Sequence, residues 1–148
     1  AINYAKARFS AEGLTGQFDV ADFISMPYPN DTFDIALDRA ALSQVPKTSA
    51  KAAVREISRV TKNGGIFYSE IYSDRATSRG KMTDGGLLVE VDGPYSGVGQ
   101  IGFYSKSEVL ELYEEHMEVL QITHTETIDA LNKPAEIHAH WSVIARVV

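Results

Sequence analysis

Asp22 and Phe23 are the residues whose types and position best suit ligand binding. They directly follow Gln17–Ala21, a short segment that we predict to be a strand. Ligands of open α/β sheets bind in the crevice at the carboxyl ends of the strands. A carboxylate there accepts hydrogen bonds, and an aromatic ring packs against a planar group. The alternative is that Asp22 only caps the turn that follows it, as aspartate often does.

A second group of candidates follows the next predicted strand, Phe33–Leu37. Asp38, Arg39 and Ala40 come directly after this strand. Their backbone and side chains are therefore expected at the same rim of the sheet as Asp22. The alternative for Asp38 and Arg39 is a surface ion pair, which typically contributes about 0–1 kcal/mol to stability.

Ser43, Gln44, Tyr72 and Tyr95 are weaker candidates, on the side of a substrate. The two tyrosines suit the wall of a substrate pocket, but they equally suit packing inside the protein, and both alternatives stay open.

The histidines raise the hypothesis of a metal site. His138 and His140 are two residues apart, so they share a face if they lie in a strand. Because no acidic cluster with a ligand spacing accompanies them, we predict no metal site.

The hydrophobic pattern predicts the elements that position these residues. Helices are predicted at residues 2–11, from a cap at Thr48 or Ser49 to Val60, and from a cap at Ser105 or Ser107 to Tyr113. Strands are predicted at Gln17–Ala21, Phe33–Leu37, Ile66–Ile71, Met117–Thr127 and Trp141–Val148. The second helix is expected to end at Asn63-Gly64-Gly65, where glycine tolerates a positive φ.

The segment from Tyr72 to Gly102 has little periodicity and is rich in glycine. Loops of this length in compact domains are usually functional, so we predict an insertion or lid over about residues 72–102. A short hairpin around Leu87–Val91 is expected within it.

Alternating strands and helices predict a parallel sheet with helices on its faces. The last two strands have no crossover helix between them and are expected to be antiparallel. The predicted fold class is therefore α/β, with an incomplete, mostly parallel Rossmann-like sheet and an antiparallel C-terminal strand pair, in one domain of residues 1–148.

Composition excludes several classes of function. The 14 basic and 20 acidic residues give a net charge of −6, which disfavours binding of nucleic acid through its phosphates. No apolar run is long enough to span a membrane. The chain has no cysteine, which excludes disulfides and thiolate metal sites and fits a cytoplasmic protein.

Three blocks of sequence occur in a characteristic order. The first runs from Phe18-Asp19-Val20-Ala21-Asp22 through Met26-Pro27-Tyr28 to Asp31-Thr32-Phe33-Asp34, the second is Arg55–Gly65, and the third leads from Phe103-Tyr104-Ser105 to Met117-Glu118-Val119. Together they resemble the class I S-adenosylmethionine-dependent methyltransferases, especially the small-molecule group. The second block is similar to the family's E-x-x-R-V-L-K-P-G-G, from which Thr61 and Asn63 depart mildly.

The resemblance implies S-adenosyl-L-methionine as cofactor. It implies that Asp22 accepts a hydrogen bond from the adenine amino group, and that Phe23 lies against the ring. It further implies that Asp38, Arg39 and Ala40 meet the ribose and methionine parts or the methyl acceptor. Methyl transfer depends mainly on holding donor and acceptor in line, so no catalytic residue is assigned.

Two cofactor-binding patterns of that family are not found: a strand followed by a glycine-rich turn, and a second strand that ends in an acidic residue. The chain also opens without methionine, in a predicted helix. We therefore expect the carboxyl-side two thirds of a longer domain, or a truncated relative. In either case strand edges are left exposed, and a homodimer through these edges is one expected outcome.

Two functions follow. The first is a methyltransferase that acts on a small-molecule acceptor, with the acceptor selected by residues 72–102. The second is a non-catalytic methyltransferase-like module that serves in protein interaction or dimerisation.

Overall fold

A computed structural model describes residues 2–131 and 134–148. Its elements, in chain order, are α1 (Ile2–Ala11), β1 (Phe33–Arg39), the 3-10 turn η1 (Leu42–Gln44), α2 (Lys47–Val60), β2 (Thr61–Tyr72), β3 (Arg79–Met82), β4 (Leu88–Asp92), β5 (Gln100–Ile101), α3 (Lys106–Tyr113), β6 (Met117–Asp129) and β7 (Glu136–Val147). The main sheet has the order β1-β2-β7-β6, and a smaller sheet has the order β3-β4-β5.

The main sheet confirms the predicted α/β class and its antiparallel C-terminal pair. β1 and β2 are parallel, because the helix α2 returns the chain to the same end of the sheet. The pairs β2–β7 and β6–β7 are antiparallel. Among the strand pairs of the two described sheets, only β1–β2 is parallel, and a crossover helix joins these strands; an isolated parallel bridge also links Ser73 to Tyr104.

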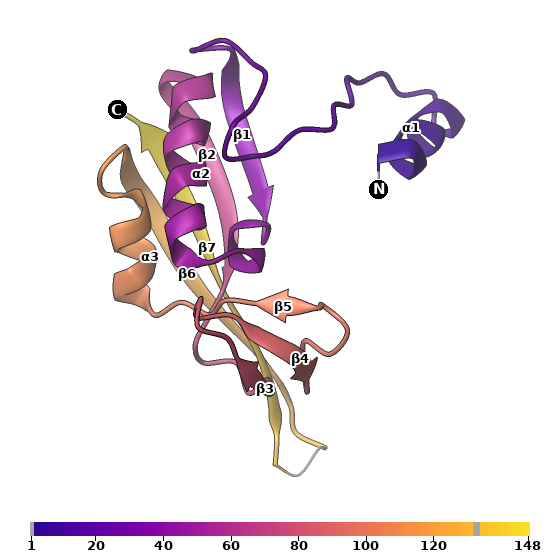
Figure 1. Cartoon of the computed structure of the whole chain (residues 1–148), viewed down its shortest axis with the longest axis vertical. Coiled ribbons are helices and arrows are strands. Elements are labelled where there is room, and N and C mark those ends of the chain that lie inside the picture. Colours follow the sequence, from indigo (N-terminus) through magenta and orange to yellow (C-terminus); the bar gives the residue numbers. More distant parts are fainter. Residues whose placement is uncertain (1, 132–133) are drawn as a thin grey trace.

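The core lies between the sheet and one layer of helices. α2 and α3 cover the same face of the main sheet (Figure 1). α2 buries an apolar stripe at helical spacing, as predicted; its members are Ala50, Ala53, Val54, Ile57 and Val60. α3 begins at Ser105, one of the two predicted caps, which forms a capping box with Glu108.

The opposite face of the sheet is open at β1. On β1 the side chains of Ile35 and Leu37 are 62% and 73% exposed. α1 lies apart from the sheet and buries none of its residues (Figure 1). The expectation of helices on both faces is therefore not met among the described residues.

Three local predictions are wrong. Gln17–Ala21 is not a strand, because no described strand lies beside it to satisfy its backbone groups. α2 begins at Lys47, so Thr48 and Ser49 lie inside its first turn instead of capping it. α2 ends at Val60, and residues 63–65 belong to β2, where Gly64 has the positive φ that was expected (+79°).

The predicted insertion is more ordered than its composition suggested. Residues 79–101 form an antiparallel sheet of three short strands, of which β4 covers most of the expected hairpin. Gly102 N–H donates to the carbonyl of Ser43 at 2.7 Å, which fastens this small sheet to η1.

Candidate functional site

The turn after β1 is held together by Asp38. This side chain is only 7% exposed, and its two oxygens accept hydrogen bonds from the Ala41 N–H at 2.8 Å and the Ser69 hydroxyl at 2.9 Å. Burial raises the pKa of Asp38, and the hydrogen bonds from Ser69 and Ala41 oppose this rise. The carboxylate is therefore occupied inside the protein, and a ligand would meet the backbone of this turn.

Ala40 supplies the turn's strained residue. Its φ is +64°, in the left-handed region that costs a non-glycine residue energy. The hydrogen bond from the Ala41 N–H to the Asp38 carboxylate stabilises the turn and offsets this strain. Such strain is common beside ligand sites.

Arg39 points away from this turn to the open face of the sheet. Its side chain is 82% exposed and lies 3.4 Å from the Glu70 carboxylate. Glu70 also accepts the Tyr68 hydroxyl at 2.9 Å. Arg39 therefore has the surface ion pair of the alternative hypothesis, although its partner is Glu70 and not Asp38.

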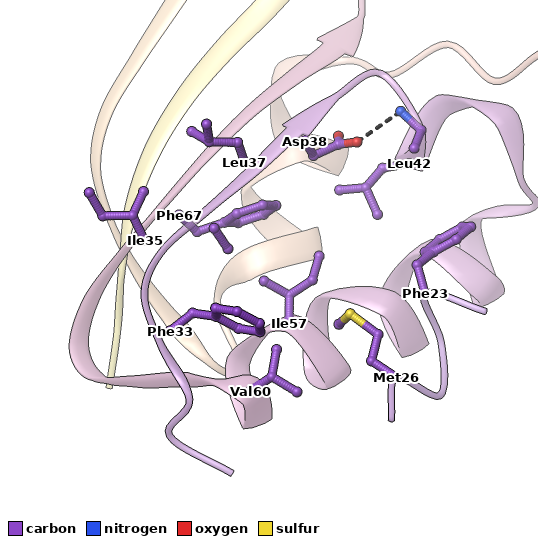
Figure 2. A pocket seen from close by; sticks show the side chains of 12 residues that line it. Phe23, Met26, Phe33, Ile35, Leu37, Asp38, Leu42, Ile57, Val60 and Phe67 are labelled. Carbon is purple, nitrogen blue, oxygen red and sulfur yellow. Dashed lines mark hydrogen bonds between the residues drawn. The ribbon is translucent and has the colours of Figure 1, made fainter. Parts of the chain in front are cut away.

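Asp22 caps its own turn, as the alternative hypothesis stated. Its Oδ1 accepts the Ile24 N–H at 3.1 Å, and its carbonyl accepts the Ser25 N–H at 3.0 Å. This arrangement orients the neighbouring Phe23 toward the main body (Figure 2).

Phe23 and Asp38 line one pocket of about 340 Å³. The pocket runs along β1 to its carboxyl end, between β1, α2 and the segment that precedes β1 (Figure 2). It is almost entirely apolar; the lining residues are Phe23, Met26, Phe33, Ile35, Ala36, Leu37, Asp38, Ala41, Leu42, Ile57, Val60 and Phe67. The structure thus brings Phe23 to the turn after β1, whereas Asp22, Arg39 and Ala40 are outside the pocket lining.

Glu56 and Arg59 lie off the buried apolar stripe of α2, the pattern of a solvent-facing side, but they organise one wall of the pocket. Arg59 donates to Glu56 from two nitrogens, at 2.9 Å and 2.7 Å, and both side chains reach the segment that carries Phe23. The Arg59 guanidinium, with help from the Met26 N–H, lowers the pKa of Glu56 to about 2 despite partial burial. In the sequence, the i,i+3 spacing of Glu56 and Arg59 indicates that the two side chains can form an ion pair on the helix.

The predicted substrate residues fall into two groups. Ser43 is fully buried, and its hydroxyl accepts the Tyr72 N–H at 3.1 Å, so it serves the structure. The Gln44 carbonyl accepts the Gln100 side-chain amide at 2.6 Å, which is a second link to the small sheet.

Tyr72 and Tyr95 do come together. Their ring centroids are 4.4 Å apart, where β2 meets the small sheet. The Tyr95 hydroxyl donates to the Ala139 carbonyl at 3.0 Å. Burial raises the pKa of both phenols, so both are neutral donors at physiological pH.

The part of the chain that the structure describes contains no group of three or more side chains that could hold a metal ion. Nor does it contain a helix long and apolar enough to cross a membrane.

Comparisons with known proteins identify the fold. Residues 1–69 match the sequence model of the family described as "Methyltransferase domain". An uncharacterized protein of Haemophilus influenzae is 32% identical over 69 residues, which are 45% of this chain and 28% of that protein.

Solved structures extend the likeness to the rest of the chain. A SAM-dependent methyltransferase from Methanosarcina mazei has a TM-score of 0.77 at 18% identity, over 100% of this chain and 77% of that one. A putative methyltransferase from Bacillus halodurans has a TM-score of 0.71 at 14% identity, over 98% and 78%. The 1,6-didemethyltoxoflavin-N1-methyltransferase of Burkholderia thailandensis, solved with bound 1,6-didemethyltoxoflavin and S-adenosylhomocysteine, has a TM-score of 0.65 at 13% identity, over 97% of this chain and 56% of that one.

Residues 1–69 therefore carry the sequence pattern of the methyltransferase domain, and the described chain has the fold of solved SAM-dependent methyltransferases, as the resemblance implied.

Proposed function

We propose that this chain forms part of an S-adenosylmethionine-dependent methyltransferase that acts on a small-molecule acceptor. The observation that carries the proposal is the shared pocket of Phe23 and the turn after β1. Phe23 and Asp38, which come from separate parts of the sequence, line one apolar cavity. Such a cavity suits a flat ring such as adenine.

The residues present fit the adenine side of this cofactor. Phe23 and Leu42 offer apolar surfaces for the ring. One carboxylate oxygen of Asp22 is used by Ile24, which leaves the other for an exocyclic amino group. The ribose and methionine parts would extend toward the turn after β1, where Asp38, Ala41 and Leu42 line the pocket. When bound, S-adenosylmethionine supplies a sulfonium-borne methyl group.

The acceptor side is proposed at the junction of β2 with the small sheet. Tyr72 and Tyr95 form an aromatic surface there, and residues 72–102 select the acceptor. A relative of this fold methylates 1,6-didemethyltoxoflavin, which supports a small molecule as acceptor. The acidic net charge of −6 and the absence of cysteine support a metabolite acceptor and a cytoplasmic location over nucleic acid or an oxidising compartment.

Calorimetric titration with S-adenosylhomocysteine tests the cofactor site. Phe23→Ala is expected to weaken binding up to about tenfold, since an aromatic contact is worth about 0.5–1.5 kcal/mol and about 1.4 kcal/mol corresponds to a factor of ten. Phe18→Ala is the matched control, because Phe18 packs edge-to-face on Phe9, away from the pocket. Equal affinities of the two variants would count against the pocket. Transfer of labelled methyl groups from S-adenosylmethionine to compounds in a small-molecule extract tests the acceptor class.

The second candidate function, an interaction module, is favoured by the exposed apolar residues of β1. Ile35 and Leu37 lie on a strand that pairs only with β2 in the described chain. Exposed edges of this kind pair readily with another strand. We propose that residues outside these 148, or a second copy, cover this edge. Sedimentation of the wild type and of Leu37→Lys distinguishes the two cases. If a second copy covers the edge, the wild type is a dimer and Leu37→Lys is a monomer; if other residues cover it, the two proteins sediment alike.

A further inference from the structure

The segment that carries Phe23 is fastened to the main body by two side chains of α2. Arg59 donates to the carbonyls of Met26 at 3.1 Å and Tyr28 at 2.9 Å, and to the side-chain oxygen of Asn30 at 2.9 Å. Glu56 accepts the Met26 N–H at 2.7 Å. The pair therefore binds both the donor and the acceptor of one peptide-chain residue, Met26, whose side chain lines the pocket.

Few other contacts hold this segment. Apart from half-buried Phe18, residues 12–22 are exposed, and α1 buries nothing. The N–H groups of Asp31 and Thr32 donate to the carbonyls at the end of α2, but they lie beyond the pocket wall. The side chains of Phe23 and Met26 also pack against the main core, but among the described residues the hydrogen bonds that fix the Met26 backbone come from Glu56 and Arg59.

Arginine is chemically suited to this position. Its planar guanidinium donates in several fixed directions at once, so it can hold a carboxylate, two carbonyls and an amide oxygen together. Lysine keeps the charge, but its single ammonium group lacks this fork. Arg59 also donates to the same Glu56 oxygen that accepts the Met26 N–H, so it orients this carboxylate toward Met26.

We propose that Glu56 and Arg59 are positioning residues for the cofactor pocket: they hold the Phe23–Met26 wall at the distance from β1 that the ligand requires. This inference rests on the proposed function. Holding the wall before the ligand arrives removes the entropy cost of ordering it on binding.

Arg59→Lys tests the pair, with Arg55→Lys as control. Arg55 lies one turn earlier on the exposed side of α2, and its side chain makes no hydrogen bond within the described residues. The first readout is the affinity for S-adenosylhomocysteine, measured well below the melting temperature. The second is amide hydrogen exchange at Met26. Arg59→Lys is expected to bind about tenfold more weakly and to exchange faster at Met26, and Arg55→Lys to match the wild type in both.

Unchanged exchange at Met26 in Arg59→Lys overturns the proposal, and so does faster exchange with unchanged affinity. If the wild type itself binds no S-adenosylhomocysteine, the proposed function fails, while the exchange measurement still decides whether the pair holds the wall. If Arg59→Lys does not fold, Glu56→Gln takes its place: it keeps an amide oxygen for Met26 and loses the charge that orients Arg59, so the same two changes are expected at smaller size.

Discussion

Asp38 offers the sharpest test of how the turn after β1 is built. Asparagine at this position keeps an oxygen for the Ala41 N–H, and its amide can donate to the Ser69 hydroxyl. Alanine leaves both groups without a partner in a site that is 7% exposed. An unsatisfied buried group costs about 1–3 kcal/mol, so the loss of both partners in Asp38→Ala is expected to lower the free energy of unfolding by about 2–6 kcal/mol.

Asp38→Asn is expected to gain stability relative to the wild type, by an amount that depends on pH. Burial raises the pKa of Asp38 in the folded protein above that in the unfolded chain. The folded state therefore takes up the proton at a higher pH than the unfolded state. Its penalty is fully present above the folded pKa and is lost as pH falls toward the unfolded value of about 3.9. Asparagine carries no such penalty, so its stability relative to wild type is greatest near neutral pH and declines toward about pH 4.

Urea unfolding, followed by the fluorescence of Trp141, measures both effects at several pH values. Asp34→Ala is the matched control on the same strand, because Asp34 forms only an exposed ion pair with Lys62 and its loss should change little. The reasoning is refuted if Asp38→Ala is as stable as Asp34→Ala, or if Asp38→Asn loses as much stability as Asp38→Ala at neutral pH. If Asp38→Asn keeps its affinity for S-adenosylhomocysteine, the carboxylate is structural and not a cofactor ligand.

Three further predictions concern the core, the small sheet and the pocket wall. Val54→Ala, in the fully buried stripe of α2, should cost about 2 kcal/mol by urea unfolding, and a cost near zero would contradict the packing of α2 on the sheet. Ser43→Ala removes the acceptor of the Tyr72 N–H and should cost about 1–2 kcal/mol, with faster proteolysis between residues 73 and 102; an unchanged cleavage rate would show that Ser43 does not hold the small sheet. Because Arg59 lowers the pKa of Glu56 to about 2, the stabilisation from Glu56 is present above its ordinary pKa and is lost as pH falls toward 2. The difference in melting temperature between wild type and Glu56→Gln should therefore shrink between about pH 5 and about pH 2; a constant difference would contradict this.

The sequence by itself determined the elements whose pattern is local. The stripe of α2 recurs at helical spacing, so its buried face follows from that spacing alone. The start of β1 at Phe33 was likewise readable from a short apolar run, and the cap of α3 was narrowed to Ser105 or Ser107, of which the structure shows Ser105. The three family-like blocks predicted the class of fold, because each block is a short sequence pattern and the order of the blocks can be read along the chain.

Only the tertiary structure decided how separate segments share the site. Gln17–Ala21 has the composition of a strand, but strand formation requires a neighbour, and none of the described strands lies beside it. Glu56 and Arg59 fit the solvent side of an amphipathic helix by pattern, yet they bind a segment about 30 residues earlier in the chain. Asp38 lines the pocket as well as holding the turn after β1, and only the structure shows that its carboxylate accepts hydrogen bonds from Ala41 and Ser69. Periodicity records which face of an element is apolar, whereas the partner of a polar side chain depends on which distant backbone the fold brings within hydrogen-bond reach.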